Sequence, residues 1–154
     1  MTIRKATIKD LGKISELNLK LFQFERQFSD SCSLDWTFSQ IGQTYFTNRI
    51  TQENGIVFVA ENNVHTIGYL CGYVFDFKAR QPSSMAEIDN MYVEDKFRSQ
   101  GIGGQLIKAF ESEAKKRGVA RLKVGAIFQN QQAVDFYEKS GFHSHEIMLE
   151  KDLN

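Results

Sequence analysis

A glycine-rich segment in the second half of the chain has the residue types of a phosphate-binding loop. Residues 98–104, RSQGIGG, lie between a predicted strand and an amphipathic helix. At such a junction free backbone N–H groups and the helix dipole attract an anion, and glycines let the backbone approach a phosphate closely. The segment lacks the Gly-Lys-Ser/Thr ending of a P-loop, and Leu106 stands where a dinucleotide fingerprint needs Gly or Ala. It therefore predicts another kind of pyrophosphate site, although a plain strand-to-helix turn would use similar glycines.

Two carboxylates lie shortly before this loop. Glu87 and Asp89 are two residues apart in a predicted strand, so their side chains point to the same face. Repulsion between paired carboxylates can keep one of them partly protonated near neutral pH, which suits acid and base chemistry. The same pattern is also open to a plainer interpretation, in which both are solvated charges on an edge strand.

A second block follows the loop after one helix and one strand. Residues 130–142, NQQAVDFYEKSGF, resemble the Asn-x-x-Ala-x-x-x-Tyr-x-x-x-Gly-Phe segment of the GNAT (Gcn5-related N-acetyltransferase) superfamily. The loop, with Arg98, Gly101 and Gly103, resembles the Gln/Arg-x-x-Gly-x-Gly/Ala acetyl-CoA signature of the same family. Two motifs in the right order are more specific than either alone, and the resemblance extends over essentially the whole chain. It implies an enzyme that transfers an acetyl group from acetyl-CoA to a primary amine.

The implied reaction needs a base and an acid. An alkylamine has a pKa of about 10, so it must lose a proton before it attacks a thioester, and a proton donor helps the thiolate to leave. The resemblance assigns the acid to Tyr137 and the base to Glu87, acting directly or through a water, with Asp89 beside it. By spacing alone, Tyr137 would instead be a packing aromatic next to Phe136 on a helical core stripe.

The resemblance also implies which residues hold acetyl-CoA. Backbone groups of Met91 and Val93 are expected to bind the pantetheine arm like an added strand, and a backbone N–H near Met91 to polarise the thioester carbonyl. Arg98 and the loop N–H groups are expected to bind the phosphates, and Asn130 to contact the pantetheine or the acceptor side. The full expected set is Met91, Tyr92, Val93, Arg98, Ser99, Gln100, Gly101, Ile102, Gly103, Gly104, Asn130, Ala133, Phe136, Tyr137 and Lys139.

The acceptor is expected to be a small cationic molecule, such as a polyamine or an aminoglycoside-like compound. Acidic and aromatic residues of the first two helices, together with the strand carboxylate, are the candidates for its pocket: Phe24, Glu25, Phe28, Trp36 and Glu87. Aromatic residues on paired helices are more often core. Two alternatives stay open, a protein N-terminal or lysine acetyltransferase and a CoA-binding sensor module without turnover.

These residues must be positioned by a mixed fold. Apolar residues at helical spacing predict four helices, the first after the capping pair Thr7 and Asp10. Strands are predicted at residues 3–6, 56–60, 66–77, 85–93, 121–128 and 142–150. Antiparallel strands followed by a strand-helix-strand unit predict an α+β (mixed α/β) class. The resemblance implies one domain over residues 1–154, with a mostly antiparallel sheet of six to seven strands flanked by about four helices.

The composition limits the classes of partner that the protein is expected to bind. The 154 residues carry a formal net charge of zero, so no basic excess is available to neutralise a nucleic acid. No apolar stretch has the length of a signal peptide or membrane span, which predicts a cytoplasmic protein without a membrane partner. Two cysteines without metal spacing are expected to be free thiols, and His143 and His145 are not expected to bind a metal. A homodimer is an expectation drawn from the family.

Overall fold

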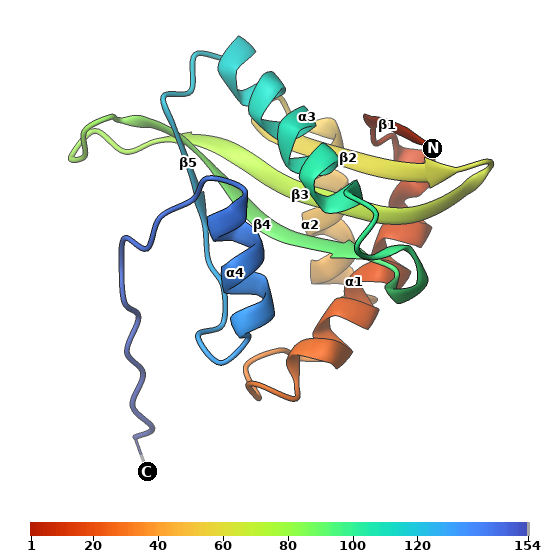
Figure 1. Ribbon diagram of the computed structural model, residues 1–154, viewed down its shortest axis with the longest axis horizontal. Helices are drawn as coiled ribbons and strands as arrows, with labels where there is room; N and C mark the ends of the chain where they lie inside the picture. The colour runs from red at the N-terminus through yellow and green to blue at the C-terminus, as the bar shows by residue number, and fades with distance from the viewer. Residues whose placement is uncertain (154) are drawn as a thin grey trace.

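The computed structural model describes residues 1–153 as five strands, four α-helices and two short 3-10 turns (Figure 1). In chain order these are β1 (Thr2–Lys5), a 3-10 turn (Ile8–Asp10), α1 (Leu11–Glu25), α2 (Gln40–Thr51), β2 (Gly55–Asn62), β3 (His65–Asp76), β4 (Ser84–Val93), a 3-10 turn (Asp95–Phe97), α3 (Ile102–Lys116), β5 (Arg121–Val124) and α4 (Gln131–Lys139). The predicted mixed α/β class and the four helices are confirmed.

The strands form one sheet in the order β1-β2-β3-β4-β5. Each of the first three pairings is antiparallel, and β5 joins β4 in parallel after the crossover through α3. The predicted hairpin between β2 and β3 turns at Asn63, whose φ of 56° is left-handed. Asparagine tolerates that conformation better than most side chains.

The number of strands differs from the expected six to seven. In the described part of the chain, residues 142–150 form no strand, and β5 ends at Val124 rather than at residue 128. A strand needs a neighbour to satisfy its backbone N–H and C=O groups. Residues 143–153 are exposed and extend away from the sheet (Figure 1). Glu146 contacts Arg80 at 3.0 Å, but within the described residues no strand lies beside this segment to pair with it.

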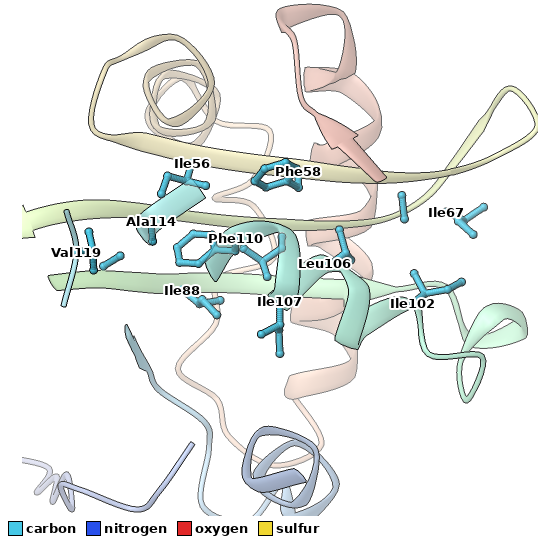
Figure 2. Close-up of a cluster of buried hydrophobic side chains, with 13 residues drawn as sticks. Ile56, Phe58, Ile67, Ile88, Ile102, Leu106, Ile107, Phe110, Ala114 and Val119 are labelled. Atoms are coloured by element: carbon cyan, nitrogen blue, oxygen red, sulfur yellow. The ribbon is translucent and has the colours of Figure 1, made fainter. Parts of the chain in front are cut away.

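Alternation along the strands produces two cores, one on each face of the sheet. On one face, α3 contributes Leu106, Ile107 and Phe110, which meet Phe58 and Ile88 from the strands (Figure 2). On the other face, α1 and α2 pack against inward-facing side chains of β2, β3 and β4, with Ile14, Leu17, Phe46, Val59 and Tyr69 fully buried.

The ends of the first two helices follow local capping rules. Thr7 and Asp10 form the predicted capping box, which opens a 3-10 turn that runs into α1. Ser39 caps α2 by accepting a hydrogen bond from the N–H of Gly42. Because α2 begins only at Gln40, Trp36 precedes the helix rather than lying on it. Among residues 1–153, no helix combines the length and the apolarity needed to cross a membrane.

Candidate active site

The site is organised around a fork between β4 and β5. The two parallel strands pair only from Met85 with Arg121 to Ile88 with Val124, whereas β4 continues to Val93. Past this point no strand of residues 1–153 pairs with the edge of β4, and α4 lies next to the diverging chain (Figure 1). An extended ligand can therefore pair with this part of β4 as an added strand would.

Strand alternation settles which backbone groups face the fork. The N–H of Glu94 donates to the carbonyl of Ile67 on β3, so the backbone groups of Val93 and Met91 point the opposite way, towards the fork. These are the two residues expected to hold a pantetheine arm. The carbonyl of Val93 accepts a hydrogen bond from Nε of Arg98, which leaves the Val93 N–H and the Met91 groups to meet a ligand.

A bulge in β4 produces this arrangement. The register with β3 shifts between Cys71 and Gly72, where Asp89 is the extra residue on β4. Before the bulge Ala86 and Ile88 face the α3 core, and after it Met91 and Val93 do so. The bulge was not predicted, because nothing in the local sequence distinguishes it from a regular strand.

The glycine loop lies at the start of α3, next to the fork. Ser99 and Gly101 have φ values of 59° and 77°, and both residues are exposed with Gln100. A Cβ added at Gly101 or Gly104 would meet no atom within 4 Å. Two glycines at the N-terminus of a 15-residue helix thus border open space, where a phosphate group fits against free N–H groups and the positive end of the dipole.

The remaining loop residues have structural functions. The Ile102 side chain is buried in the α3 core, so only its backbone is available to a ligand. A Cβ at Gly103 would lie 2.9 Å from Phe136, so this glycine allows α3 and α4 to approach closely. Arg98 does not point into the loop: its guanidinium pairs with Asp95 at 2.9 Å and lies over the rings of Phe24 and Tyr92.

The second sequence block forms the start and inner face of α4. Asn130 is buried and caps the helix, because its side-chain oxygen accepts from the N–H of Ala133 at 3.2 Å. Phe136 and Tyr137 are partly buried against the α3 core, Ala133 is partly buried, and Lys139 is exposed in the last turn. A cofactor contact of Asn130 would have to coexist with this cap.

Tyr137 lies between Phe136 and Phe142, with ring centroids 5.3 and 5.7 Å away. Burial raises the pKa of its hydroxyl above the ordinary value, and the negative charge of Glu25 raises it further. Glu25 ends α1 on the opposite face of the sheet, so the two groups approach each other from the two faces of the fork. A tyrosine that keeps its proton at neutral pH is suited to act as an acid.

The pKa of the Glu25 carboxyl is also shifted. Burial raises the pKa of its carboxyl, while a hydrogen bond from the thiol of Cys32 at 3.3 Å acts in the other direction. Glu25 was among the expected acceptor residues, whereas Cys32 was not. Burial and the nearby carboxylate also raise the pKa of the Cys32 thiol to about 11, so it stays protonated.

The two β4 carboxylates both face α2 but have separate partners. Glu87 accepts from the hydroxyl of Tyr73 at 3.3 Å and has Nζ of Lys123 at 3.7 Å. Asp89 accepts from Nε of Arg49 at 2.9 Å and from the hydroxyl of Tyr45. Each carboxylate therefore has its own cationic partner.

Next to these carboxylates the structure contains polar groups that sequence reasoning missed. Asn90 donates to the Tyr45 hydroxyl at 3.4 Å, while its buried Oδ1 atom has no hydrogen-bond partner among residues 1–153. The guanidinium of Arg49 lies 4.0 Å from the ring centroid of Tyr73. Only the packing of α2 against β3 and β4 brings these side chains together.

The aromatic residues expected at the acceptor pocket divide into two groups. Phe24 and Phe28 stack edge to face near the end of α1, at 5.5 Å, and Phe24 lies beneath Arg98. Trp36 packs on Tyr45 and Phe46 at 5.3 and 6.0 Å and belongs to the α1/α2 core. The contacts of Trp36 are therefore those of a core residue.

A further surface hollow lies elsewhere. Its volume is about 700 Å³, and its lining includes Lys5, Asn54, Val74 and Arg117. Arg117 follows the C-terminal end of α3, roughly 22 Å along that helix from the glycine loop. The hollow is therefore separate from the fork.

Residues 19–142 match the model of the acetyltransferase (GNAT) family. An uncharacterized N-acetyltransferase of Methanocaldococcus jannaschii is 28% identical over 151 residues, which are 96% of this chain and 62% of that protein. The chain thus spans less than two thirds of that relative's length.

Two solved structures show the same fold. A mutant of the BH1408 protein from Bacillus halodurans superposes with a TM-score of 0.87 over the whole of both chains, at 20% identity. An aminoglycoside N-acetyltransferase in complex with CoA superposes with a TM-score of 0.77 over 99% of this chain and 93% of that chain, at 16% identity. At these sequence identities the similarity shows only that the fold is shared.

The fork, the glycine loop and the family match define an acetyl-CoA-dependent N-acyltransferase class. The chain belongs to the acetyltransferase (GNAT) family.

Proposed function

We propose that this chain transfers the acetyl group of acetyl-CoA to a primary amine of a small cationic molecule. The observation that carries the proposal is the coincidence of three features at one place: the unpaired edge of β4, the open glycine loop, and the hydroxyl of the partly buried Tyr137. An extended thiol arm and its phosphates need the first two, and a leaving thiolate needs the third.

In this proposal acetyl-CoA binds along the fork. Its phosphates meet the N–H groups at the start of α3, beside Gly101 and Gly104, and its pantetheine arm pairs with Met91 and the Val93 N–H. Arg98 stabilises this binding site indirectly by bonding the Val93 carbonyl, and Asn130 by capping α4. The open space at Gly101 and Gly104 supports the fit of a phosphate group.

Tyr137 then donates its proton to the departing thiolate. Glu87, directly or through a water, takes the proton of the attacking amine. The hydroxyl of Tyr73 and the Nζ atom of Lys123 hold this carboxylate in place at 3.3 and 3.7 Å. Asp89, bound by Arg49 and Tyr45, positions α2 against β4 and does not itself move a proton.

The acceptor reaches the fork from the α1 and α2 face. Glu25 contributes a half-buried carboxylate near Tyr137, and Glu87 a second one, so a cationic amine is attracted by both. The unpartnered Oδ1 of Asn90 offers a further acceptor for an N–H donor on this face. The aminoglycoside acetyltransferase with the same fold is consistent with this substrate class.

The proposal is tested by incubating the purified chain with acetyl-CoA and a panel of amines, while free CoA is followed with a thiol reagent. The panel contains a polyamine, an aminoglycoside, a lysine-containing peptide and a peptide with a free N-terminus. Amine-dependent CoA release that is greatest with the first two compounds supports the proposal. Release only with peptides contradicts the substrate class, and acetyl-CoA binding without release contradicts the enzyme itself.

A further inference from the structure

The sheet carries an aromatic pair that belongs to neither core of the described chain. Tyr73 and Phe75 are alternate residues of β3, so their side chains point to the same face, and both are partly exposed. Among residues 1–153, neither contributes to the α3 core or to the α1/α2 core. At this end β3 and β4 extend past α2 (Figure 1), so that helix leaves the pair uncovered.

Tyr73 places this pair beside the proposed base. Its hydroxyl donates to Glu87 at 3.3 Å, and the guanidinium of Arg49, from α2, lies 4.0 Å from its ring centroid. The ring of Phe75 follows at a centroid distance of 5.3 Å, with an angle of 31° between the two ring planes. The faces of the two rings therefore have similar orientations, on the side of the sheet from which the acceptor arrives.

The strand register sets the distance from Phe75 to the base. Glu87 lies opposite Tyr73, and Met85 lies opposite Phe75, on the side away from the fork. Two residues along a strand span roughly 7 Å, a separation that one ring attached close to an amine can bridge. An acceptor whose amine lies at Glu87 therefore places its next atoms over Phe75.

The charges around the pair favour an uncharged group over a second ammonium. Arg49 already lies over Tyr73, while the exposed Arg121 and Lys123 alternate with core residues of β5 and so face the same side as the pair. These cations repel a further positive charge, which an aromatic face alone attracts. An apolar ring face is not repelled, and its contact with Phe75 removes apolar surface of both from water.

We infer that the acceptor is an amine with a six-membered ring close to its amino group, and that Phe75 binds the face of this ring while the amine lies at Glu87. This inference rests on the proposed acetyl transfer and adds a specificity-determining residue to it. Sugar rings and aromatic rings both present an apolar face of C–H groups or π electrons to an aromatic side chain, so amino sugars and arylalkylamines share the recognised chemistry.

The test compares amines with and without a ring, using the full chain. The probes are a methyl glucoside with an amine in place of its primary hydroxyl, benzylamine, and heptylamine, which has as many carbons as benzylamine but no ring. Phe75→Ala is the variant. Phe77→Ala is the matched control, since this phenylalanine is 47% exposed just beyond the end of β3 and lies beside Arg80.

The readout is kcat/KM for each ring amine divided by kcat/KM for heptylamine, measured from the release of CoA. This ratio cancels the fraction of active enzyme, and its comparison between variants cancels the intrinsic reactivity of each amine. We expect Phe75→Ala to lower the ratio at least about fivefold, through a higher KM for the ring amine, and Phe77→Ala to leave it within about twofold of the wild type.

The outcomes separate this inference from the proposed function. A lower ratio for the glucoside identifies an amino-sugar acceptor, and a lower ratio for benzylamine an arylalkylamine; either supports the inference. A ratio that Phe75→Ala leaves unchanged, or that falls equally in Phe77→Ala, overturns ring binding by Phe75 while acetyl transfer stands. The absence of CoA release with all three amines overturns the proposed function and this inference together.

Discussion

The hydroxyl of Tyr137 is the group on which the proposed reaction depends most directly. Its neighbours are the rings of Phe136 and Phe142, and the charge of Glu25 acts on it from across the fork. Each of these influences keeps the proton on the oxygen. The hydroxyl therefore suits the part of a general acid and not that of a general base.

Tyr137→Phe removes the proton donor while keeping the ring and its packing. We expect kcat to fall by about 10²-fold, the range for loss of one acid group, with acetyl-CoA affinity and melting temperature close to the wild type. Steady-state kinetics, calorimetric titration of acetyl-CoA and thermal melts check this. An unchanged kcat would exclude Tyr137 as the acid.

Glu87→Gln keeps the hydrogen bond from Tyr73 but removes the basic carboxylate. We expect kcat/KM to fall by about 10²-fold and the rise of rate with pH that belongs to this base to disappear. The pH–rate profile is the measurement, with Glu53→Gln, an exposed position, as the control. A variant that retains the wild-type rise would show that another group takes the proton.

Glu25→Gln separates substrate binding from stability. Loss of the carboxylate is expected to raise KM for a cationic amine by about tenfold. Because burial raises the folded-state pKa of Glu25, ionising this group costs folded stability above its ordinary pKa of about 4.3. The variant should therefore melt at a higher temperature than the wild type at pH 7 and at the same temperature below pH 4. A lower melting temperature at pH 7 would contradict the cost assigned to this carboxylate.

At the scale of elements, the site depends on how three of them end. Strand β4 extends five residues beyond its pairing with β5, because the pairing ends at Ile88 and β4 ends at Val93. Helix α3 begins with glycines that leave its first N–H groups accessible, and α4 is held close to α3 through contact of Phe136 with Gly103. The fork is the space that these three ends leave between them.

Gly104→Leu tests the start of α3. A Cβ added at Gly104 meets no atom within 4 Å, so we expect the leucine to be tolerated in the fold and to occupy the space assigned to a phosphate. We expect acetyl-CoA affinity to fall at least about tenfold. Gly12→Leu is the matched control, because Gly12 also lies in the first turn of a helix and faces open space. Equal affinities for the two variants would place the phosphates elsewhere.

At the scale of the whole molecule, one charged cluster connects the sheet edge to the first helix. Arg4 of β1 contacts Asp10 at 2.8 Å and Glu61 of β2, and Asp10 also accepts from the N–H of Thr7 at 2.7 Å. The hydrogen bond from Arg4, together with the bonds from Thr7, lowers the pKa of Asp10 from 3.8 to about 2 despite its burial. The cluster fixes where α1 leaves the sheet.

Asp10→Asn should make the fold less stable in a pH-dependent manner. A folded-state pKa below the unfolded value stabilises the fold above about pH 4, and this contribution is lost as the pH falls towards 2. We expect a loss of about 2 kcal/mol in the free energy of unfolding at pH 7. Urea unfolding at pH 7, 4 and 2.5 measures it, with the exposed Asp35→Asn as the control. A difference that does not shrink at low pH would mean that lost packing, rather than charge, is responsible.

Much of the fold follows from local rules and was predicted correctly. The capping box at Thr7, the hairpin between β2 and β3, and the helix that follows the glycine loop are encoded by neighbouring residues. The strand expected at residues 142–150 was wrong for the described chain, because a composition suited to a strand does not supply the neighbour that a strand requires. A strand forms only where a neighbouring strand can satisfy its backbone N–H and C=O groups.

The candidate site, like the fold, was predictable from the sequence only in part. Motif spacing in the sequence determined the family, the glycine loop and the choice of Tyr137, since these depend on residue types at fixed separations. Only the tertiary structure decided that Glu25 acts on Tyr137, that Asp89 is bound by Arg49, and that Arg98 lies over aromatic rings. These relations join residues that are distant in the chain, and side-chain contacts of that kind are set by the packing of helices on the sheet.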